Sequence, residues 1–458
     1  MFKNKDIKNL FLGTYVRTVV TSYAAFTLIG AILLFLPISV QDNQSLSFID
    51  ALFVAASGMS VTGLSTINIS TTLTRFGQVV LIVIMQVGGV GIMLFLAGLW
   101  VISGKKISLK ERNIVVTDQN QLKQGGIIRL VKDVLRLILI IELIGFIVLS
   151  SYLYFNNYYS LGESLFQGFF LSISMFANAG FDISGKSMTM FADQKGYFVL
   201  TIAMILIFLG SVGYWVLVET KDFIKAKLKK QKFEFSLYVK LIFKMHILLY
   251  IIGAILFIIF EANNLLLGKS FFDYIFNSLF MSITTRNAGF TTLNTSQLTN
   301  STHWLFNALM FIGASPNSVG GGIRTSSLII LLYSIYSFAI GRRQVIIGKR
   351  AIKDSTIYKA FMVFTVGIII IFLSVLTIST IETSFSIKEI LFEVFSAFGT
   401  TGLSLGITPH LTIFSKIILI INMFIGRIGI ISLLLSFKGR DEAKNRVKYP
   451  EYDMIVGA

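Results

Sequence analysis

The chain has 458 residues, of which 54% are hydrophobic and only 14% are charged, and its apolar runs are long enough to cross the roughly 30 Å hydrocarbon core of a bilayer as helices. This composition excludes a water-soluble enzyme and indicates a polytopic membrane protein. The formal net charge of +17 does not indicate a nucleic-acid partner, because the basic residues gather in the segments that join the apolar runs. The lack of cysteine excludes disulfides and thiolate metal sites.

Eight apolar segments are predicted to span the membrane, and an even number returns the chain to the side on which it starts. They are 18–38, 76–103, 134–154, 197–218, 241–260, 303–338, 360–380 and 413–437. Most of the 40 Lys and Arg residues lie before the first segment, after the last, or in alternate connections. Both termini are therefore expected on the cytoplasmic side, where basic segments are retained. Apart from Arg324 and Arg427, the remaining basic residues, with Arg286 among them, are assigned to the outer loops.

Each of the four outer connections contains an acid, a phenylalanine three residues later, and then a glycine between apolar residues. The acid and phenylalanine pairs are Asp50 and Phe53, Glu163 and Phe166, Asp273 and Phe276, and Glu389 and Phe392. We expect the acids to cap the N-termini of short helices rather than to coordinate ions. The glycines recur at intervals of 117, 109 and 113 residues, which predicts four copies of one structural unit.

The segment between phenylalanine and glycine is too short to cross a bilayer, so each outer connection is predicted to enter the membrane as a short helix and return. Each copy then reads as M1 helix, pore helix and M2 helix, and the fold class is all-α, with four re-entrant loops around a pseudo-fourfold central pore. A ring of backbone carbonyls at the glycines would replace the hydration shell of a monovalent cation. The predicted carbonyl donors are Val61, Thr62, Gly63, Asn178, Ala179, Gly180, Asn287, Ala288, Gly289, Thr400, Thr401 and Gly402.

The second helices of repeats 1, 2 and 4 carry the small-residue patches 88–91, 210–213 and 426–429, which are expected to allow close packing or bending. The third repeat instead has a stretch rich in glycine and polar residues at 313–327 that cannot continue a helix. We predict that it forms an intramembrane loop below the filter and acts as a gate. Its proposed gate residues are Gly313, Ser315, Pro316, Asn317, Ser318, Gly320, Gly321 and Gly322.

Three charged residues fall well inside apolar segments, away from the segment ends, where charges usually face a protein interior or a water-filled cavity. Arg427 could form a packing ion pair or bond to helix-end carbonyls, but we favour an electrostatic barrier that contacts the gate loop from across the pore. Arg324, at the end of the loop, either holds the loop or neutralises nearby carbonyls. Glu142 has no partner that the sequence identifies.

The filter sequences, the Ser-Pro-Asn-Ser-Val-Gly-Gly-Gly-Ile-Arg stretch at 315–324 and Phe-Ile-Gly-Arg-Ile-Gly at 424–429 together resemble the Trk/Ktr/HKT superfamily of potassium transporters. The resemblance covers the whole chain and is greatest to the bacterial Ktr-type membrane subunits, which the tail at 446–450 also resembles. Here the loop is richer in glycine than in many relatives. Because glycine is retained in all four filters, the resemblance implies a preference for potassium.

The resemblance further implies one pore per protomer, a homodimer in the bacterial cell membrane, and a cytosolic ring of nucleotide-binding RCK-type subunits of the KtrA/KtrC kind. It implies potassium as the transported ion, sodium as a possible activator, and no organic cofactor on this chain. The expected repeats are 1–103, 104–219, 220–340 and 341–458.

Two other function classes compete with a potassium pore. A sodium-coupled potassium symporter is the nearer one, but such transporters typically show inverted repeats, whereas these four repeats run parallel. A membrane enzyme would need a nucleophile with its base, or metal ligands. The histidines His246, His303 and His410 share no ligand spacing, so we expect no catalytic residues.

Overall fold

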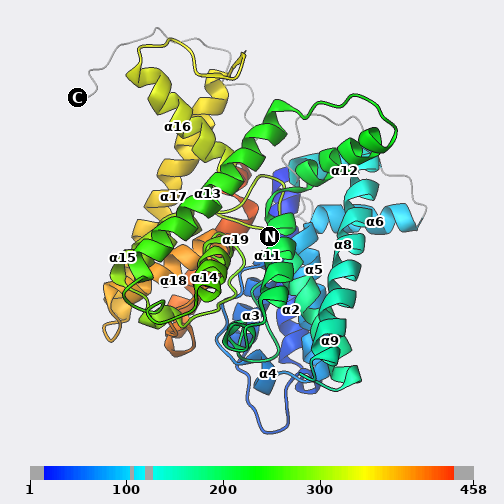
Figure 1. Cartoon of the computed structure of the whole chain (residues 1–458), viewed down its shortest axis with the longest axis vertical. Helices are drawn as coiled ribbons and strands as arrows, with labels where there is room; N and C mark the ends of the chain where they lie inside the picture. The colour runs from blue at the N-terminus through cyan, green and yellow to red at the C-terminus, as the bar shows by residue number, and fades with distance from the viewer. Residues whose placement is uncertain (1–14, 104–107, 119–126, 438–458) are drawn as a thin grey trace, which may run out of the picture.

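The computed structural model describes residues 15–103, 108–118 and 127–437, which are mostly helical (Figure 1). The predicted N-terminal segment before residue 15 and the tail with its 446–450 motif lie outside these residues. Four long apolar helices occupy the predicted M1 positions. They are α2 (Tyr15–Phe35), α8 (Ile127–Phe155), α13 (Leu237–Glu261) and α17 (Asp354–Ile381). A two-stranded hairpin of β1 (Ile346–Ile347) and β2 (Arg350–Ala351) is a small departure from an all-helical chain.

A short helix follows each long helix, as the sequence predicts for the pore helices. These four are α3 (Phe48–Ser60), α9 (Leu161–Phe176), α14 (Phe271–Thr284) and α18 (Ile387–Gly399). Each packs against the long helix that precedes it. With 13 to 16 residues, at about 1.5 Å per residue, they reach only part of the way across a bilayer.

The predicted M2 spans of repeats 1, 2 and 4 are not continuous helices. Each breaks into two helices at the last glycine of its small-residue patch: Gly91, Gly213 and Gly429 have φ of 91°, 101° and 89°. The bends between the halves are 97°, 105° and 99°. The halves are α5 (Arg75–Val90) and α6 (Ile92–Ile102), α11 (Tyr197–Ser211) and α12 (Tyr214–Leu228), and α19 (Ile413–Ile428) and α20 (Ile430–Phe437). Such φ values favour glycine, so the bending that the small-residue patches were expected to allow is confirmed.

The third M2 is interrupted over a longer stretch, between α15 (Asn300–Ile312) and α16 (Thr325–Ala339). Counting each bent pair as one span gives seven candidate spans among the described residues, by length and composition. The eighth predicted crossing is the third M2, whose two halves are separated by this longer interruption. Short elements lie in the connections. They are η1 (Pro37–Ser39), α4 (Ile69–Thr72), α7 (Leu109–Asp118), α10 (Thr189–Asp193), η2 (Thr295–Gln297) and η3 (Thr408–His410).

The four repeats close into a ring. The outer half of each M2 packs against the short helix of the next repeat: α5 against α9, α11 against α14, and α15 against α18. The fourth, α19, returns to α3 of the first repeat. This closed succession is the pseudo-fourfold arrangement that the sequence repeats predict.

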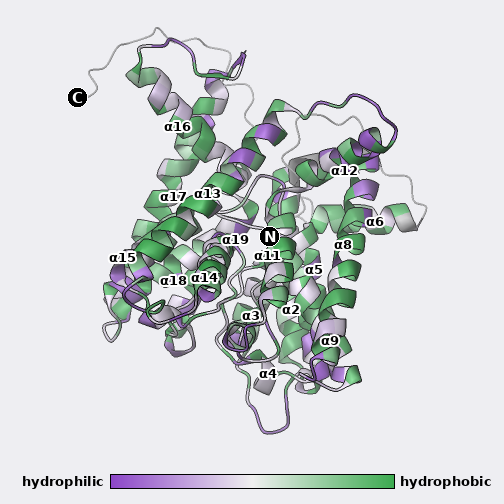
Figure 2. Cartoon of the chain, in the orientation of Figure 1, coloured by the Kyte–Doolittle hydropathy of each residue, from purple (hydrophilic) through white to green (hydrophobic). Residues whose placement is uncertain are grey.

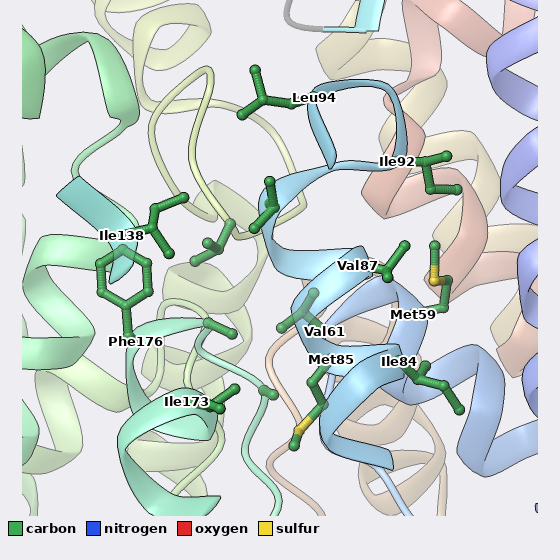
Figure 3. Packing of buried hydrophobic residues seen from close by; sticks show 14 of the residues in the cluster. Met59, Val61, Ile84, Met85, Val87, Ile92, Leu94, Ile138, Ile173 and Phe176 are labelled. Carbon is green, nitrogen blue, oxygen red and sulfur yellow. The ribbon is translucent and has the colours of Figure 1, made fainter. Parts of the chain in front are cut away.

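Hydrophobic residues run along the long helices, and hydrophilic residues concentrate toward the two ends of the molecule (Figure 2). The interior between the repeats is also apolar. Figure 3 shows Val61, Met85 and Val87 from repeat 1 packed near Ile173 and Phe176 of α9, all in one buried cluster. The filter segments therefore rest on a hydrophobic core.

The four signature acids lie in the first turn of the short helices, as expected for capping. Ser270 with Asp273, and Ser386 with Glu389, form complete capping boxes, in which side chain and backbone satisfy each other's free donors. Hydrogen bonds from Ser386 to the Glu389 carboxylate hold the pKa of that group below its usual value. In the first repeat, the Ser47 side chain accepts a hydrogen bond from the Asp50 backbone N–H.

Three of these acids also join neighbouring repeats, which the sequence did not reveal. Lys416 in α19 donates to Asp50 over 2.9 Å, and Tyr197 in α11 donates to Asp273 over 2.7 Å. Glu163 is the third of these acids. The N-cap residue of its helix makes no side-chain capping bond, and Glu163 forms an ion pair with Arg75 at the start of α5. Polar contacts between neighbouring repeats therefore connect the outer edge of the ring.

The first glycine of each small-residue patch packs on the end of a short helix. A Cβ on Gly88, Gly210 or Gly426 would overlap the carbonyl oxygen of Met59, Phe176 or Phe398, respectively. The predicted close packing is therefore present, together with the bend three residues later.

We predict that Gly210→Val destabilises the protein by about 1–3 kcal/mol, the usual cost of forcing extra atoms into a packed core. The measurement is the thermal unfolding midpoint in detergent, followed by size-exclusion chromatography of heated samples. Gly162→Ala is the control, because a Cβ there meets no atom within 4 Å. Equal midpoints for the two variants would contradict the packing argument.

Candidate functional site

The four filter segments share one backbone pattern. In each, the two residues before the glycine are buried and the glycine is partly exposed. The glycines at 63, 180, 289 and 402 have φ of 96°, 68°, 73° and 93°. In three repeats the first filter residue is also left-handed: Val61, Asn178 and Thr400 have φ of 58°, 53° and 50°. Asn287 of the third repeat is not among the residues with positive φ, and it lies three residues after the end of its short helix, compared with one or two in the other repeats.

The four glycines meet in one ring. A Cβ built on Gly63 would lie 2.6 Å from the Ala179 oxygen and 2.9 Å from the Gly180 Cα, and a Cβ on Gly180 would lie 2.8 Å from the Ala288 oxygen. The same contact continues from Gly289 to the Thr401 oxygen, and from Gly402 to the Thr62 oxygen. Each glycine thus faces a carbonyl of the next repeat, and no larger residue fits at these positions.

A buried hydroxyl braces each filter segment, and sequence reasoning missed all four. Ser57 and Ser396 each accept a hydrogen bond from the filter glycine N–H over 3.0 Å. In the other two repeats the hydroxyls of Ser174 and Thr284 donate to the carbonyls of Phe181 and Phe290, just past the glycine, over 2.7 and 2.8 Å. The signal was present in the sequence as a Ser or Thr six positions before each glycine, or five in the third repeat.

The predicted gate stretch forms a non-helical loop at 313–324. Helix α16 begins at Thr325, so the predicted end of the loop at 327 is three residues too late. At this helix start, the Thr325 hydroxyl accepts a hydrogen bond from the Arg286 side chain. The Thr325 N–H, which has no partner within the helix, donates to the Ala314 carbonyl over 3.0 Å. The two ends of the loop therefore lie side by side.

The loop contacts the filter segments directly. The Gly321 N–H donates to the Thr400 hydroxyl over 2.7 Å, and a Cβ on Gly320 would clash with the Asn287 side chain. On its other side, the Asn317 carbonyl accepts from the Tyr214 N–H over 2.7 Å at the break between α11 and α12. The loop is thus held between two filter segments and the bend of the second repeat.

Arg427 joins the loop to the opposite side of the ring. Its Nη1 donates to the Val319 carbonyl, and its Nη2 donates to the carbonyls of Gly88 and Gly89 at the end of α5. Both geometries weighed from the sequence, helix-end carbonyls and the gate loop, are therefore present together. Arg324 donates to the carbonyl of Gly320 within the loop, and to the Arg427 carbonyl over 3.4 Å.

Comparison with known proteins identifies the family. The family model described as "TrkH: Cation transport protein" matches residues 4–448. The chain belongs to the TrkH family of cation transport proteins. The superfamily resemblance drawn from the motifs is thereby confirmed, and the chain is a transport protein rather than an enzyme.

Three relatives and one solved structure illustrate the match to the TrkH family. "Ktr system potassium uptake protein D" and "Ktr system potassium uptake protein B", both of Bacillus subtilis (strain 168), are 44% and 37% identical, each over 94% of both chains. "Potassium/sodium uptake protein NtpJ" of Enterococcus hirae is 32% identical over 96% of this chain and 97% of its own. The crystal structure of the potassium transporter TrkH from Vibrio parahaemolyticus has a TM-score of 0.73 at 18% identity, over 93% of this chain and 86% of its own, and so supports the fold.

Two residues of this TrkH-family chain have environments that the sequence did not give. Arg286, which the sequence analysis assigned to an outer loop, lies beside the third filter segment with only 1% of its surface exposed. Its Nη2 donates to the Gly313 carbonyl at the start of the gate loop. Glu142, which had no identified partner, accepts a hydrogen bond from the Gln86 side chain over 2.9 Å. Within the described residues, no three His, Asp or Glu side chains form a metal-binding group.

We predict that Ser396→Ala weakens discrimination between potassium and sodium. Removing the hydroxyl leaves the Gly402 N–H unsatisfied, which costs about 1–3 kcal/mol for a buried donor and allows the filter backbone to shift. The measurement is the ratio of potassium to sodium flux into liposomes. Ser379→Ala is the control, because the Ser379 hydroxyl bonds to a backbone carbonyl on the exposed side of α17. An unchanged ratio in Ser396→Ala would show that the brace is dispensable.

Proposed function

We propose that this chain is the potassium-translocating membrane subunit of a bacterial uptake system, and that potassium passes through it as through a channel. The observation that carries the proposal is the ring of four glycines, each against a carbonyl of the next repeat. Carbonyl rings suit a dehydrated monovalent cation. The filter residues are the twelve named above, and the names of the Ktr relatives support potassium as the ion.

The loop at 313–324 serves as the gate in this proposal. Its contacts with Thr400 and Asn287 support a position directly against the filter segments. The bonds from Arg427 support a barrier of positive charge at the same level. Opening would require the loop to leave these partners, and glycines at 320–322 allow its backbone to rearrange.

The proposal extends to the assembly that the family resemblance implies. The subunit would form a homodimer in the cell membrane, with both termini in the cytoplasm and one pore in each protomer, divided into the repeats 1–103, 104–219, 220–340 and 341–458. A cytosolic RCK-type ring would drive the gate. In support, the α12 to α13 connection and the hairpin between α16 and α17 lie at the same end of the molecule (Figure 1) and carry many basic residues.

A sodium-coupled symporter is the second candidate. It is kept because the E. hirae relative is named as a potassium/sodium uptake protein. Sodium could also act only as an activator, without crossing the membrane. The two possibilities differ in whether potassium entry carries sodium with it.

The deciding experiment is cation flux into liposomes that contain the purified chain, with potassium and sodium gradients applied separately and together. We expect selective potassium entry that needs no sodium, and its loss in Gly289→Asp, because a side chain there overlaps the Thr401 carbonyl. Gly268→Asp is the control, since no atom lies within 4 Å of a Cβ at that outer-loop glycine and aspartate tolerates its left-handed backbone.

Potassium entry only with sodium entry in a fixed ratio would favour the symporter. No flux from the chain alone, but flux after addition of a cytosolic RCK-type subunit, would show an obligatory gating partner. Equal sodium and potassium flux through a well-folded protein would contradict the proposed filter.

We further predict that Arg427→Gln raises potassium flux through the chain alone by about tenfold, because hydrogen bonds from a charged donor each contribute roughly 1.5–3 kcal/mol to holding the loop. The flux is measured in the same liposomes, at equal protein content. A fall in flux would mean that Arg427 supports the open state rather than the barrier.

A further inference from the structure

Arg286 is the largest fully buried side chain of the molecule, judged over the described residues, and it stands between the filter and the gate loop. It directly precedes the filter triplet of the third repeat. Its Nη2 donates to the Gly313 carbonyl and to the Thr325 hydroxyl, the latter over 2.9 Å. These two acceptors lie at opposite ends of the loop, so one guanidinium group holds both ends.

The two ends of the loop also bond to each other. The Thr325 N–H donates to the Ala314 carbonyl over 3.0 Å, and the Ile323 N–H donates to the Phe311 carbonyl over 3.0 Å. We call these four residues with Gly313 the neck of the loop. The neck is the part of the loop that Arg286 contacts, whereas Arg427 and Thr400 contact its middle.

A second set of polar contacts surrounds the same place. The guanidinium carbon of Arg286 lies 5.1 Å from the Tyr250 ring centre, a cation–π distance. The Tyr250 hydroxyl is 3.0 Å from the Ser211 hydroxyl, which is 3.1 Å from one nitrogen of His246. The other nitrogen of His246 is 3.2 Å from Ser315, inside the loop. A chain of polar groups therefore runs from the filter arginine back to the gate.

The position is specific to the repeat that carries the loop. The residues that directly precede the other three filter triplets are Ser60, Ala177 and Gly399. None has a side chain that could reach a neighbouring M2 helix in this way. The arginine and the interrupted helix thus occur together in the third repeat.

Because Arg286 is buried, the loss of its hydrogen bonds to the loop would be energetically costly. Among the described residues its Nε and Nη1 have no hydrogen-bond partner, so Nη2 alone provides its hydrogen bonds. If the neck moved away, the buried charge would lose both of its hydrogen-bond acceptors, which is costly. Loop movement and the position of the third filter segment are therefore linked through this one side chain.

We propose that Arg286 is a positioning residue that clamps both ends of the gate loop to the third filter segment, so that the gate cannot open without a change at Asn287–Gly289. This proposal rests on the proposed function of the loop as a gate. It adds that the filter and the gate are mechanically coupled, and that the coupling belongs to the third repeat alone.

Accessibility of the loop tests the clamp without relying on flux. The chain contains no cysteine, so Ser318→Cys creates a single thiol in the loop, and its modification by a membrane-impermeant thiol reagent is timed in detergent-purified and liposome-embedded protein. In Arg286→Met we expect modification at least about tenfold faster, because both charge-assisted bonds to the neck are lost. Arg286→Lys retains a donor and should give an intermediate rate.

Further variants separate a clamp from a merely structural arginine. Thr325→Val removes one acceptor while keeping the shape of the side chain, and should speed modification of Ser318→Cys by a few-fold. Arg75→Met is the control, because it removes an arginine that pairs at the outer edge, and it should leave the rate unchanged. A second reporter, Ser65→Cys beyond the filter, should be modified equally fast with and without Arg286→Met.

An unchanged modification rate at residue 318 in both Arg286→Met and Thr325→Val would overturn the proposal. An equal increase in the modification rates at residues 65 and 318 would also overturn it, because that result would indicate general loosening of the structure. If Arg286→Met does not fold, Thr325→Val and Arg286→Lys decide alone by the same criterion. A faster rate at residue 318 without any rise in potassium flux would keep the clamp and contradict the gate function of the loop.

Discussion

Backbone groups at the depth of the filter lie away from bulk water, and each must find a partner within the protein or in the passing ion. The rest of the architecture follows from this constraint. The short helices carry chain into the membrane, and the hydroxyls of Ser57, Ser174, Thr284 and Ser396 satisfy groups beside the glycines. In the proposed function, the carbonyls that face the neighbouring glycines are the ones that bind a cation.

The near-symmetry of the repeats accounts for the ring, and the proposed gate lies where this symmetry breaks down, in the third repeat. Three M2 helices turn sharply at a single glycine, whereas the third opens into the loop at 313–324. Charges that would be costly elsewhere gather around this loop: Arg286 at its neck, Arg427 at its middle, and Arg324 within it. Each donates to at least one backbone carbonyl, and Arg286 donates to a hydroxyl as well, so these arginines hold main chain in place.

The sequence was sufficient for features that depend on period and composition. The spans, the short helices, the ring glycines and the loop all follow from apolar length and from residues that cannot continue a helix. Features that depend on three-dimensional neighbours were missed. The sequence permitted bending at Gly91 but not a turn of 97°, because the angle depends on what the two halves pack against.

Arg286 shows the same limit most clearly. It follows a short helix in a segment that reads as an outer loop, and only the return of the third M2 beneath that helix brings the Gly313 carbonyl to it. The inter-repeat contacts of Asp50 and Asp273 were hidden for the same reason, since Lys416 and Tyr197 lie far away in sequence. Hydroxyls before the glycines could have been noticed as a repeat, but their role required the folded backbone.

The central claim is that a monovalent cation binds inside the ring of Gly63, Gly180, Gly289 and Gly402. The most direct test is a crystal structure of the protein with thallium in place of potassium, because thallium is located by its anomalous scattering. The account predicts an anomalous peak on the axis of this ring, surrounded by carbonyl oxygens of all four repeats and weakened by competing potassium. A peak elsewhere with none inside the ring would contradict it.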